Sequence, residues 1–397
     1  MSRLAIIGGK LQGIEACYLA GKAGIQTLLI DKNPDAPARG LCTEFINVDI
    51  LLENRFLMDE LCKCDLVLPA LENQNVLDHL VELSQTFGFI LAFDPKAYAI
   101  SSSKIESDKL IHKYNLPSPA YFPNGQVPYV AKPSNGSGSD GVKILNTISE
   151  VELFLAKINS ENGKKETQDW IVQEYVSGPS YSIEVIGSKA KGYKTYKITE
   201  IFVDKEYDCN KVTSYVNLDK KSRDEFSQLG RELAALVDLD GIMDVEVILN
   251  NGELKILEID ARFPSQTPTV VLQSTGENLI VELIRHFCKK KFVEMTANEK
   301  LESNKEKKEL FVSFEHFLVE NGAISQPGEH IIGEAGKLQY IEGFCHADEA
   351  LTDFNLSENR TKFCATMINK ADSLEELESK LQIMRGELEK LVEKQNE

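Results

Sequence analysis

Short runs of apolar residues alternate with longer amphipathic stretches through the first hundred positions of the chain. The apolar runs predict β-strands at residues 4–7, 27–30, 44–48, 66–68 and 89–93. The first amphipathic stretch predicts a helix at residues 14–23. Strands that recur with helices between them indicate a parallel sheet covered on both faces. Ligands of such sheets bind beyond the carboxyl ends of the strands. Here those ends carry Gly8, Gly9, Lys10, Asp31, Asp49 and Glu72.

The pattern changes after residue 100. Residues 101–114 predict a helix, which the following Asn-Leu-Pro-Ser-Pro segment ends. Beyond this break, apolar runs predict strands at residues 129–132, 142–145, 170–175, 181–186, 242–249 and 253–259. The turn Asn250-Asn251-Gly252 is typical of a tight antiparallel hairpin between the last two strands.

These differences divide the chain into three predicted domains, at residues 1–100, 101–300 and 301–397. The charged segment 300–309 has little to bury, so we interpret it as a linker. Near the end of the chain, leucines and one methionine recur alternately every three and four residues over about three heptads. This stripe predicts a terminal helix packed on its own domain, with a coiled-coil homodimer as the alternative.

The composition limits the classes of function. Of the 397 residues, 42% are apolar and 27% charged, which is ordinary for a globular protein. The 44 basic and 62 acidic residues give a net charge of -18, which argues against a nonspecific nucleic-acid binder. No apolar run reaches the roughly 18 residues of a membrane span. The first residues resemble a buried strand rather than a signal peptide, so we expect a cytoplasmic protein.

Carboxylates are concentrated in the two strands of the last predicted hairpin. Asp244 and Glu246 share one face of the first strand, and Glu258 and Asp260 share one face of the second. Clustered carboxylates repel one another unless a cation lies among them, and hard oxygen ligands suit Mg²⁺. An exposed acidic hairpin is the alternative. The apolar residues of the opposite face, and Arg262 just beyond, favour the metal site.

Two further segments are candidates for nucleotide binding. A glycine- and serine-rich loop runs from Lys132 to Gly141, and its backbone N–H groups could surround phosphate oxygens. It lacks the Gly-Lys-Ser/Thr of a P-loop. The segment Gln173-Glu174-Tyr175-Val176 precedes a Ser-Gly hinge and could offer backbone groups to an adenine and Glu174 to ribose hydroxyls. Each segment alone is equally typical of an ordinary turn.

Together, and in this order, these motifs resemble the ATP-grasp superfamily over residues 101–300. The resemblance is carried by Lys104, Lys132, the Glu-Tyr-Val hinge and the Glu…Glu-x-Asp-x-Arg signature, where Asp260 stands in place of the usual Asn. The segments GGKLQGIEA, DKNPDA, GIMDVEVIL and EIDARFPSQTPTVV further resemble the ligases of pyrrolysine biosynthesis, from residue 1 to about 368. The departures are the loop composition, an apparent insertion near residues 159–168 and a longer tail.

This resemblance implies an α/β protein of the ATP-grasp fold, with an N-terminal, Rossmann-like parallel-sheet domain and a small C-terminal α+β domain. It implies that ATP is bound by Lys10, Asp31, Asp49, Ile50, Lys104, Lys132, Ser139, Gln173, Glu174, Tyr175 and Val176. It implies that L-lysine is bound by Leu11, Gln12 and Glu72. It implies that 3-methyl-D-ornithine is bound by Ser182, Ile183, Glu184, Asp244, Arg262, Ser265, Gln266 and Thr267. Two Mg²⁺ ions would be held by Glu246, Glu258 and Asp260.

The implied reaction joins the carboxylate of (3R)-3-methyl-D-ornithine to the ε-amine of L-lysine through an acyl phosphate. Lys104 and Lys132 would neutralise the transferring phosphoryl group, and Arg262 would stabilise the acyl phosphate. One alternative is another ATP-grasp ligase or carboxylase with a D-amino-acid or purine-pathway substrate. A nicotinamide oxidoreductase is a further alternative, because Asp31 lies where a ribose-binding acid would, although residues 8–13 depart from G-x-G-x-x-G. The last alternative is a protein module that binds a nucleotide as a sensor and catalyses no reaction.

Overall fold

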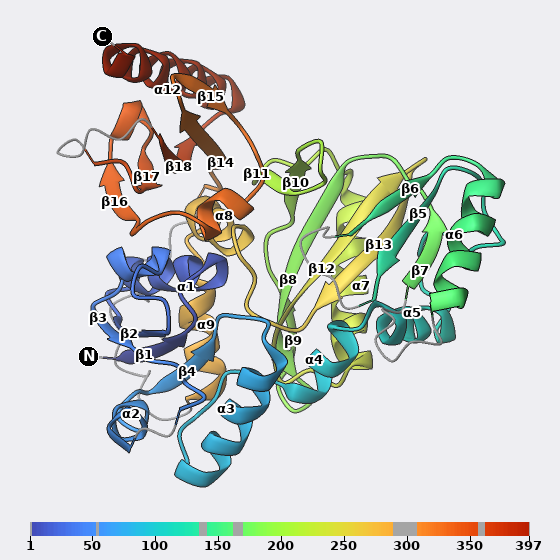
Figure 1. Ribbon diagram of the computed structural model, residues 1–397, viewed down its shortest axis with the longest axis horizontal. Helices are drawn as coiled ribbons and strands as arrows, with labels where there is room; N and C mark the ends of the chain where they lie inside the picture. The colour runs from blue at the N-terminus through green and yellow to red at the C-terminus, as the bar shows by residue number, and fades with distance from the viewer. Residues whose placement is uncertain are drawn as a thin grey trace.

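The N-terminal part of the chain is built on a parallel sheet. The computed structural model describes residues 2–52, 55–134, 141–161, 170–288, 308–355 and 362–396. Four strands pair in the order β3-β2-β1-β4, all parallel: β1 (Arg3–Ile7), β2 (Gln26–Asp31), β3 (Glu44–Asn47) and β4 (Leu66–Pro69). Helix α1 (Leu11–Lys22) packs on one face, and α2 (Arg55–Leu61) and α3 (Gln74–Phe87) pack on the other (Figure 1). The predicted parallel sheet with two covered faces is confirmed.

Three details differ from the sequence-based expectations. Helix α1 begins at Leu11 rather than Ile14, because Gly13 allows the first turn to pack on strand β1: a Cβ there would lie 2.1 Å from the Gly8 carbonyl oxygen. Residues 89–93 form no strand and contribute one isolated bridge, from Leu91 to Val67. The helix predicted at 101–114 is two helices, α4 (Pro95–Ser101) and α5 (Lys104–Lys113), because the Ser103 side chain caps α5.

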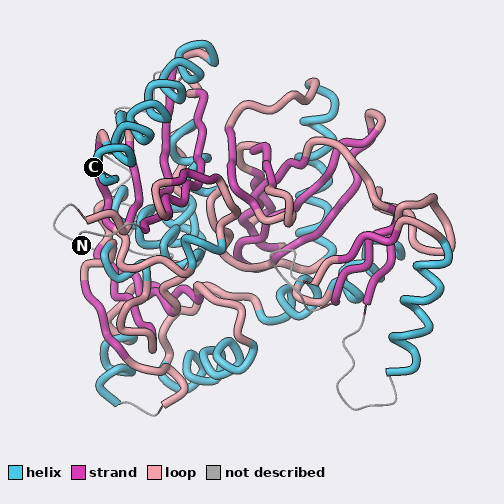
Figure 2. The backbone as a smooth tube through the Cα atoms, turned by 45° about the horizontal axis from the view of Figure 1, so that its top comes forward, coloured by secondary structure: helices cyan, strands magenta, loops and turns pink. Residues whose placement is uncertain are grey.

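A small antiparallel sheet lies at one end of the molecule. Its strands pair in the order β6-β5-β7: β5 (Tyr129–Pro133), β6 (Lys143–Leu145) and β7 (Trp170–Glu174). Helix α6 (Ile148–Glu161) packs beside it, and Figure 2 shows this unit at the opposite end of the molecule from the two chain termini. The strands predicted at residues 129–132 and 142–145 are confirmed, and they pair as an antiparallel hairpin.

One large antiparallel sheet runs through the rest of the molecule. Its path is β13-β12-β8-β10-β11-β14-β18-β17-β16, with β9 paired to β8 and β15 to β14. The first strands are β8 (Ser180–Ser188), β9 (Gly192–Thr195), β10 (Thr199–Val203), β11 (Cys209–Thr213), β12 (Gly241–Asn250) and β13 (Glu253–Asp260). The later strands are β14 (Phe311–Glu320), β15 (Ala323–Ser325), β16 (Gln339–Glu342), β17 (Glu349–Thr352) and β18 (Lys362–Ala371). The predicted hairpin of β12 and β13 is confirmed.

The large sheet crosses the predicted boundary between the second and third domains. Strand β11 pairs directly with β14, so hydrogen bonds join the two parts into one sheet. The boundary at residue 300 and most of the predicted linker fall within residues 289–307, which lie outside the described residues. Helix α7 (Lys220–Leu236) packs on β8, β9 and β12, while α8 (Thr267–Thr275) and α9 (Leu279–Phe287) pack against α1.

The leucine stripe near the end of the chain lies on helix α12 (Leu374–Asn396). Leu377, Leu381, Met384 and Leu388 are buried against side chains of β14 and β18. The predicted packing of this helix on its own domain is confirmed. Within the described parts of the chain, every helix is too short or too polar to cross a bilayer.

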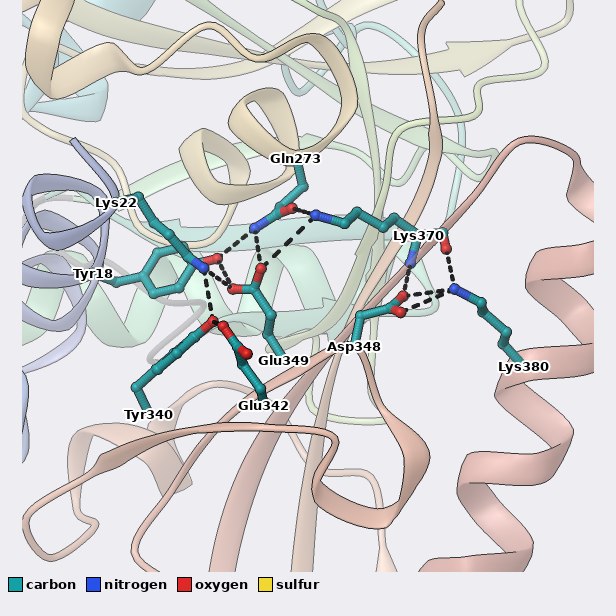
Figure 3. Close-up of polar contacts among 9 residues, drawn as sticks. All are labelled: Tyr18, Lys22, Gln273, Tyr340, Glu342, Asp348, Glu349, Lys370 and Lys380. Carbon is teal, nitrogen blue, oxygen red and sulfur yellow. Dashed lines mark hydrogen bonds and ion pairs between the residues drawn. The ribbon is translucent and has the colours of Figure 1, made fainter.

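A buried carboxylate joins the three parts of the chain (Figure 3). Glu349 on β17 accepts hydrogen bonds from Tyr18 of α1 (2.6 Å) and Gln273 of α8 (3.0 Å), and it pairs with Lys22 (2.8 Å). Burial works to raise the pKa of Glu349, but these donors hold it below its usual value. Glu349 therefore attaches the C-terminal strands to helices α1 and α8.

Candidate active site

The carboxylates of the β12–β13 hairpin form two rows across the large sheet. In the first row Glu258 lies opposite Glu246, and Glu246 lies opposite Ser182 on β8. In the second row Asp260 lies opposite Asp244, and Asp244 lies opposite Glu184. Directly opposed residues share a face of the sheet, so all six side chains lie on one surface. The strand alternation therefore predicted the carboxylate cluster correctly.

Like charges on this surface destabilise one another. Burial, with Glu258 and Asp260 nearby, raises the pKa of Glu246 to about 8. Burial also raises the pKa of Asp260 to about 7, although Arg262 opposes the shift. Burial acts in the same direction on Glu258, but Lys104 and Lys132 hold its pKa below the usual value. A further cation among these oxygens would relieve the repulsion.

This surface fits a magnesium ion that takes part of its ligands from a substrate. Within the described residues, no three His, Cys, Asp or Glu side chains surround one point as a complete metal site. Mg²⁺ commonly uses one or two carboxylates and completes its shell with phosphate oxygens and water. The opposed pair Glu246 and Glu258 meets that requirement. Asp260 is already paired with Arg262 at 3.1 Å.

Two lysines lie beside the carboxylate pair. The Lys104 ammonium is 3.3 Å from Glu258, and the Lys104 backbone N–H donates to the Ser134 carbonyl at the end of β5 (2.9 Å). Burial would lower the pKa of Lys104, yet Glu258 and Asp260 raise it above the usual value. Burial and the neighbouring Lys104 lower the pKa of Lys132. These ammonium groups are placed to meet a polyanion over the carboxylates.

A cavity of about 450 Å³ opens between the small sheet and the large sheet. It brings together the predicted nucleotide residues Lys104, Lys132, Gln173, Glu174, Tyr175 and Val176, together with Glu246 and Glu258. Ser139 lies outside the described residues. The Glu174 carboxylate already accepts from Lys255 (2.7 Å) and from the Ala120 N–H (3.1 Å), so its side chain has a structural partner where we expected ribose.

The remaining predicted nucleotide residues lie elsewhere. Lys10, Asp31, Asp49 and Ile50 line a separate cavity of about 430 Å³ at the carboxyl ends of β1 and β2. The structure does not bring them to the Lys104 cavity, and their contact with ATP stays a prediction. The Asp31 carboxylate is used within the protein, where it accepts the Gly9 N–H (2.6 Å).

The predicted lysine-binding residues line that same N-terminal cavity. They are Leu11, Gln12 and Glu72. Glu72 accepts a hydrogen bond from Gln12 (3.0 Å) and pairs with the Arg262 Nε (2.9 Å). This ion pair links the N-terminal cavity to the carboxylate surface.

Several buried polar atoms of the predicted ornithine-binding set have no hydrogen-bond partner among the residues that the structure describes. They are Ser182 Oγ, both carboxylate oxygens of Glu184, Asp244 Oδ1 and Thr267 Oγ1. Buried polar groups are normally paired, so unpaired ones grouped on one surface indicate a ligand site. Burial raises the pKa of Glu184 to about 7. The Ile183 side chain points to the opposite face and packs in the core, so only its backbone remains for a ligand.

Three acidic residues of this region were not predicted. Asp108 lies beside Gln173, and burial raises its pKa to about 6. Its position four residues after Lys104 on a helix could have indicated it. Glu15 accepts the Thr269 N–H (2.6 Å) at the start of α8, and Glu329 accepts from Ser265 and Gln266. No local pattern could have indicated these two, because the fold alone brings them to the loop.

The fold and the paired lysines and carboxylates define an ATP-grasp enzyme. Residues 101–266 match the ATP-grasp domain family. The L-amino acid ligase of Bacillus licheniformis has a similar structure, with a TM-score of 0.66, 14% identity and coverage of 98% of both chains. At this level of identity the similarity concerns the fold alone.

Closer relatives identify the particular family. The chain is 35% identical to the 3-methyl-D-ornithine–L-lysine ligase of Methanosarcina barkeri and 37% identical to that of Methanosarcina acetivorans. Each alignment covers 84% of this chain and 84% of the relative. The chain therefore belongs to the 3-methyl-D-ornithine–L-lysine ligase family. This membership decides against the nicotinamide oxidoreductase alternative.

Proposed function

We propose that this protein is an ATP-dependent, ADP-forming ligase of pyrrolysine biosynthesis. It joins the carboxylate of (3R)-3-methyl-D-ornithine to the ε-amine of L-lysine. The observation that carries this proposal is the group of buried carboxylate oxygens on Glu184 and Asp244 beside Arg262, which the described side chains leave largely without hydrogen bonds. A diamino acid carries a second ammonium group that neutralises such carboxylates, while its carboxylate is attracted to the arginine.

In this proposal the two lysines bind the phosphates of ATP. Lys104 and Lys132 neutralise charge as the γ-phosphoryl group passes to the ornithine carboxylate, which gives an acyl phosphate and ADP. Glu246, Glu258 and Asp260 would hold two Mg²⁺ ions, which add positive charge beside the phosphates. The hinge from Gln173 to Val176 lines the same cavity as the two lysines, and it would contact the adenine.

Arg262 serves the second half of the reaction. Its guanidinium stabilises the acyl phosphate and then the oxyanion that forms when the amine attacks. The ε-ammonium of free lysine has a pKa of about 10.4 and must lose a proton before attack. Glu72 lies between Gln12 and Arg262, where it orients this amine, and either Glu72 or a phosphate oxygen accepts the proton.

The proposal is tested by ADP release with both amino acids present. We expect wild-type protein to release ADP only when MgATP, L-lysine and 3-methyl-D-ornithine are all supplied, and mass spectrometry to detect the amide product. ADP release without an amide product, or with lysine omitted, would contradict the proposed ligation.

A substitution in the carboxylate pair tests the metal assignment. Glu258→Gln removes the charge that pairs with Lys104, and we expect turnover to fall by about a hundredfold or more. The exposed Glu253, on the same strand, provides the control, because Glu253→Gln leaves the site unchanged. Near-normal turnover of Glu258→Gln would refute the assignment.

A further inference from the structure

The loop between β13 and α8 contains a strained turn. Gln266 has φ 67° and ψ −58°, and the Thr267 N–H donates to the Ser265 carbonyl two residues earlier (2.8 Å). This is a γ-turn with a positive φ at a residue that carries a side chain, a rare and strained conformation. Its surroundings must therefore hold it in place. Thr267, at its end, lies beside the buried Glu184.

Glu329 contacts the side chains of two residues in this turn. One of its oxygens, Oε2, accepts from both the Ser265 hydroxyl (2.9 Å) and the Gln266 amide nitrogen (2.6 Å). The Cys209 thiol of β11 donates to the other end of the Gln266 amide, at 3.2 Å. Both amide atoms of Gln266 are thus occupied by the protein.

Glu329 is itself held firmly by its neighbours. On one side the Gly328 N–H donates to Asp204 (3.0 Å), and on the other the His330 Nδ1 lies 2.6 Å from Asp208. Asp204 and Asp208 belong to the turn between β10 and β11. A Cβ at Gly328 would lie 2.1 Å from the Asp208 Cγ, so this approach requires glycine. The carboxylate therefore reaches the γ-turn from a fixed backbone.

We propose that Glu329 is a positioning residue for the ornithine pocket. By hydrogen bonding to Ser265 and Gln266 it holds the γ-turn, and the γ-turn holds Thr267 beside Glu184. The inference rests on the proposed function, because it takes the site around Glu184 to bind the diamino acid whose carboxylate is activated. The residue comes from the C-terminal part of the chain, and it acts through the loop rather than on the reacting atoms.

Steady-state kinetics of two variants test this role. In Glu329→Ala the turn loses its acceptor, and we expect the KM for 3-methyl-D-ornithine to rise by about tenfold or more. We expect the KM values for ATP and L-lysine to change by less than about twofold, because their residues lie elsewhere. Since both donors bind one oxygen, the amide oxygen of Glu329→Gln can replace it and should restore most of the affinity. Glu334→Ala, at an exposed position just after α11 (His330–Gly333), is the matched control.

The outcomes separate this proposal from the function on which it rests. An unchanged KM for the ornithine in Glu329→Ala, an equal rise for all three substrates, or a glutamine variant as impaired as the alanine variant would overturn it. If wild-type protein forms no amide, the proposed function fails instead. The positioning role is then decided by crystal structures of wild type and Glu329→Ala: relaxation of Gln266 from positive φ supports it, and an unchanged turn overturns it.

Discussion

A buried histidine makes the stability of the protein depend on pH. His316 on β14 has its Nδ1 2.9 Å from the Thr366 hydroxyl, while its Nε2 finds no hydrogen-bond partner in the described parts of the chain. Burial lowers the pKa of His316 to about 3, whereas the unfolded chain has a value of about 6.5. Below pH 6.5 the unfolded state therefore binds a proton that the folded state does not. The stabilising effect of the neutral ring is complete above pH 6.5 and is lost progressively toward pH 3.

We expect this histidine to contribute a measurable part of the dependence of the free energy of unfolding on pH. Between pH 7.5 and pH 5, the free energy of unfolding of wild type should fall by about 2 kcal/mol more than that of His316→Gln. Urea unfolding at each pH provides the measurement. His112→Gln, at an exposed position, should keep the wild-type slope. Parallel pH profiles for wild type and His316→Gln would show that the buried ring is not responsible.

At the residue scale, the sequence predicted the positions of site side chains wherever local geometry fixes those positions. The alternation of a strand places Asp244 with Glu246, and the hairpin turn sets the pairing that brings Glu258 and Asp260 opposite them. Glu329 and Glu15 reach the site from distant segments, and no periodicity encodes such a contact. For the same reason the sequence could not reveal that Lys255 occupies the Glu174 carboxylate.

Two glycines within helices test how packing decides the effect of a substitution. A Cβ at Gly386 of α12 would meet no atom of the described residues within 4 Å, whereas one at Gly230 of α7 would lie 3.2 Å from Val185 and 3.3 Å from Ile183. Gly386→Ala should stabilise the protein by about 0.5–1 kcal/mol, through helix propensity and a less flexible unfolded chain. Gly230→Ala has the same local gain, but crowding against β8 costs about 1–3 kcal/mol.

Thermal or urea unfolding of the two variants measures the difference. We expect a higher midpoint than wild type for Gly386→Ala and a lower one for Gly230→Ala. Equal shifts of both midpoints would mean that β8 moves aside without cost, which would contradict the packing argument.

At the element scale, strands with strong turn signals were predicted well and boundaries set by capping were not. The Asn-Gly turn between β12 and β13 needs positive φ at Asn251 and Gly252, which the structure has. The break between α4 and α5 depends on the Ser103 side chain, which accepts the Glu106 N–H in place of a backbone carbonyl. The spacing of apolar residues does not reveal such a cap. Residues 89–93 are apolar enough for a strand, but only Leu91 bridges to β4.

At the scale of the whole molecule, Glu349 contributes to the attachment of the C-terminal part, alongside the pairing of β11 with β14. Replacing Glu349 with Ala leaves the ammonium of Lys22, the hydroxyl of Tyr18 and the amide of Gln273 without their shared acceptor (Figure 3). We expect a loss of about 3 kcal/mol in the free energy of unfolding, as for other buried pairs from which one partner is removed. Urea unfolding at pH 7.5 gives this value.

An exposed residue at the same junction provides the control. Glu342 accepts from the Tyr340 hydroxyl at the surface (2.8 Å), so Glu342→Ala should change the free energy of unfolding by less than about 0.5 kcal/mol. A loss of similar size in both variants would show that surface charge, rather than the buried acceptor, stabilises the junction.

The pairing of β11 with β14 has a consequence for synthesis of the protein on the ribosome. The strands that carry the carboxylate rows emerge first, while the partner of β11 begins only at Phe311. Until then the growing chain presents β11 as an open strand edge, the kind of surface on which chains pair with one another. A chain truncated before β14 should therefore aggregate, although it contains both lysines and every carboxylate of the cluster. The nascent protein therefore loses this tendency to self-associate only once β14 has been synthesised and has paired with β11.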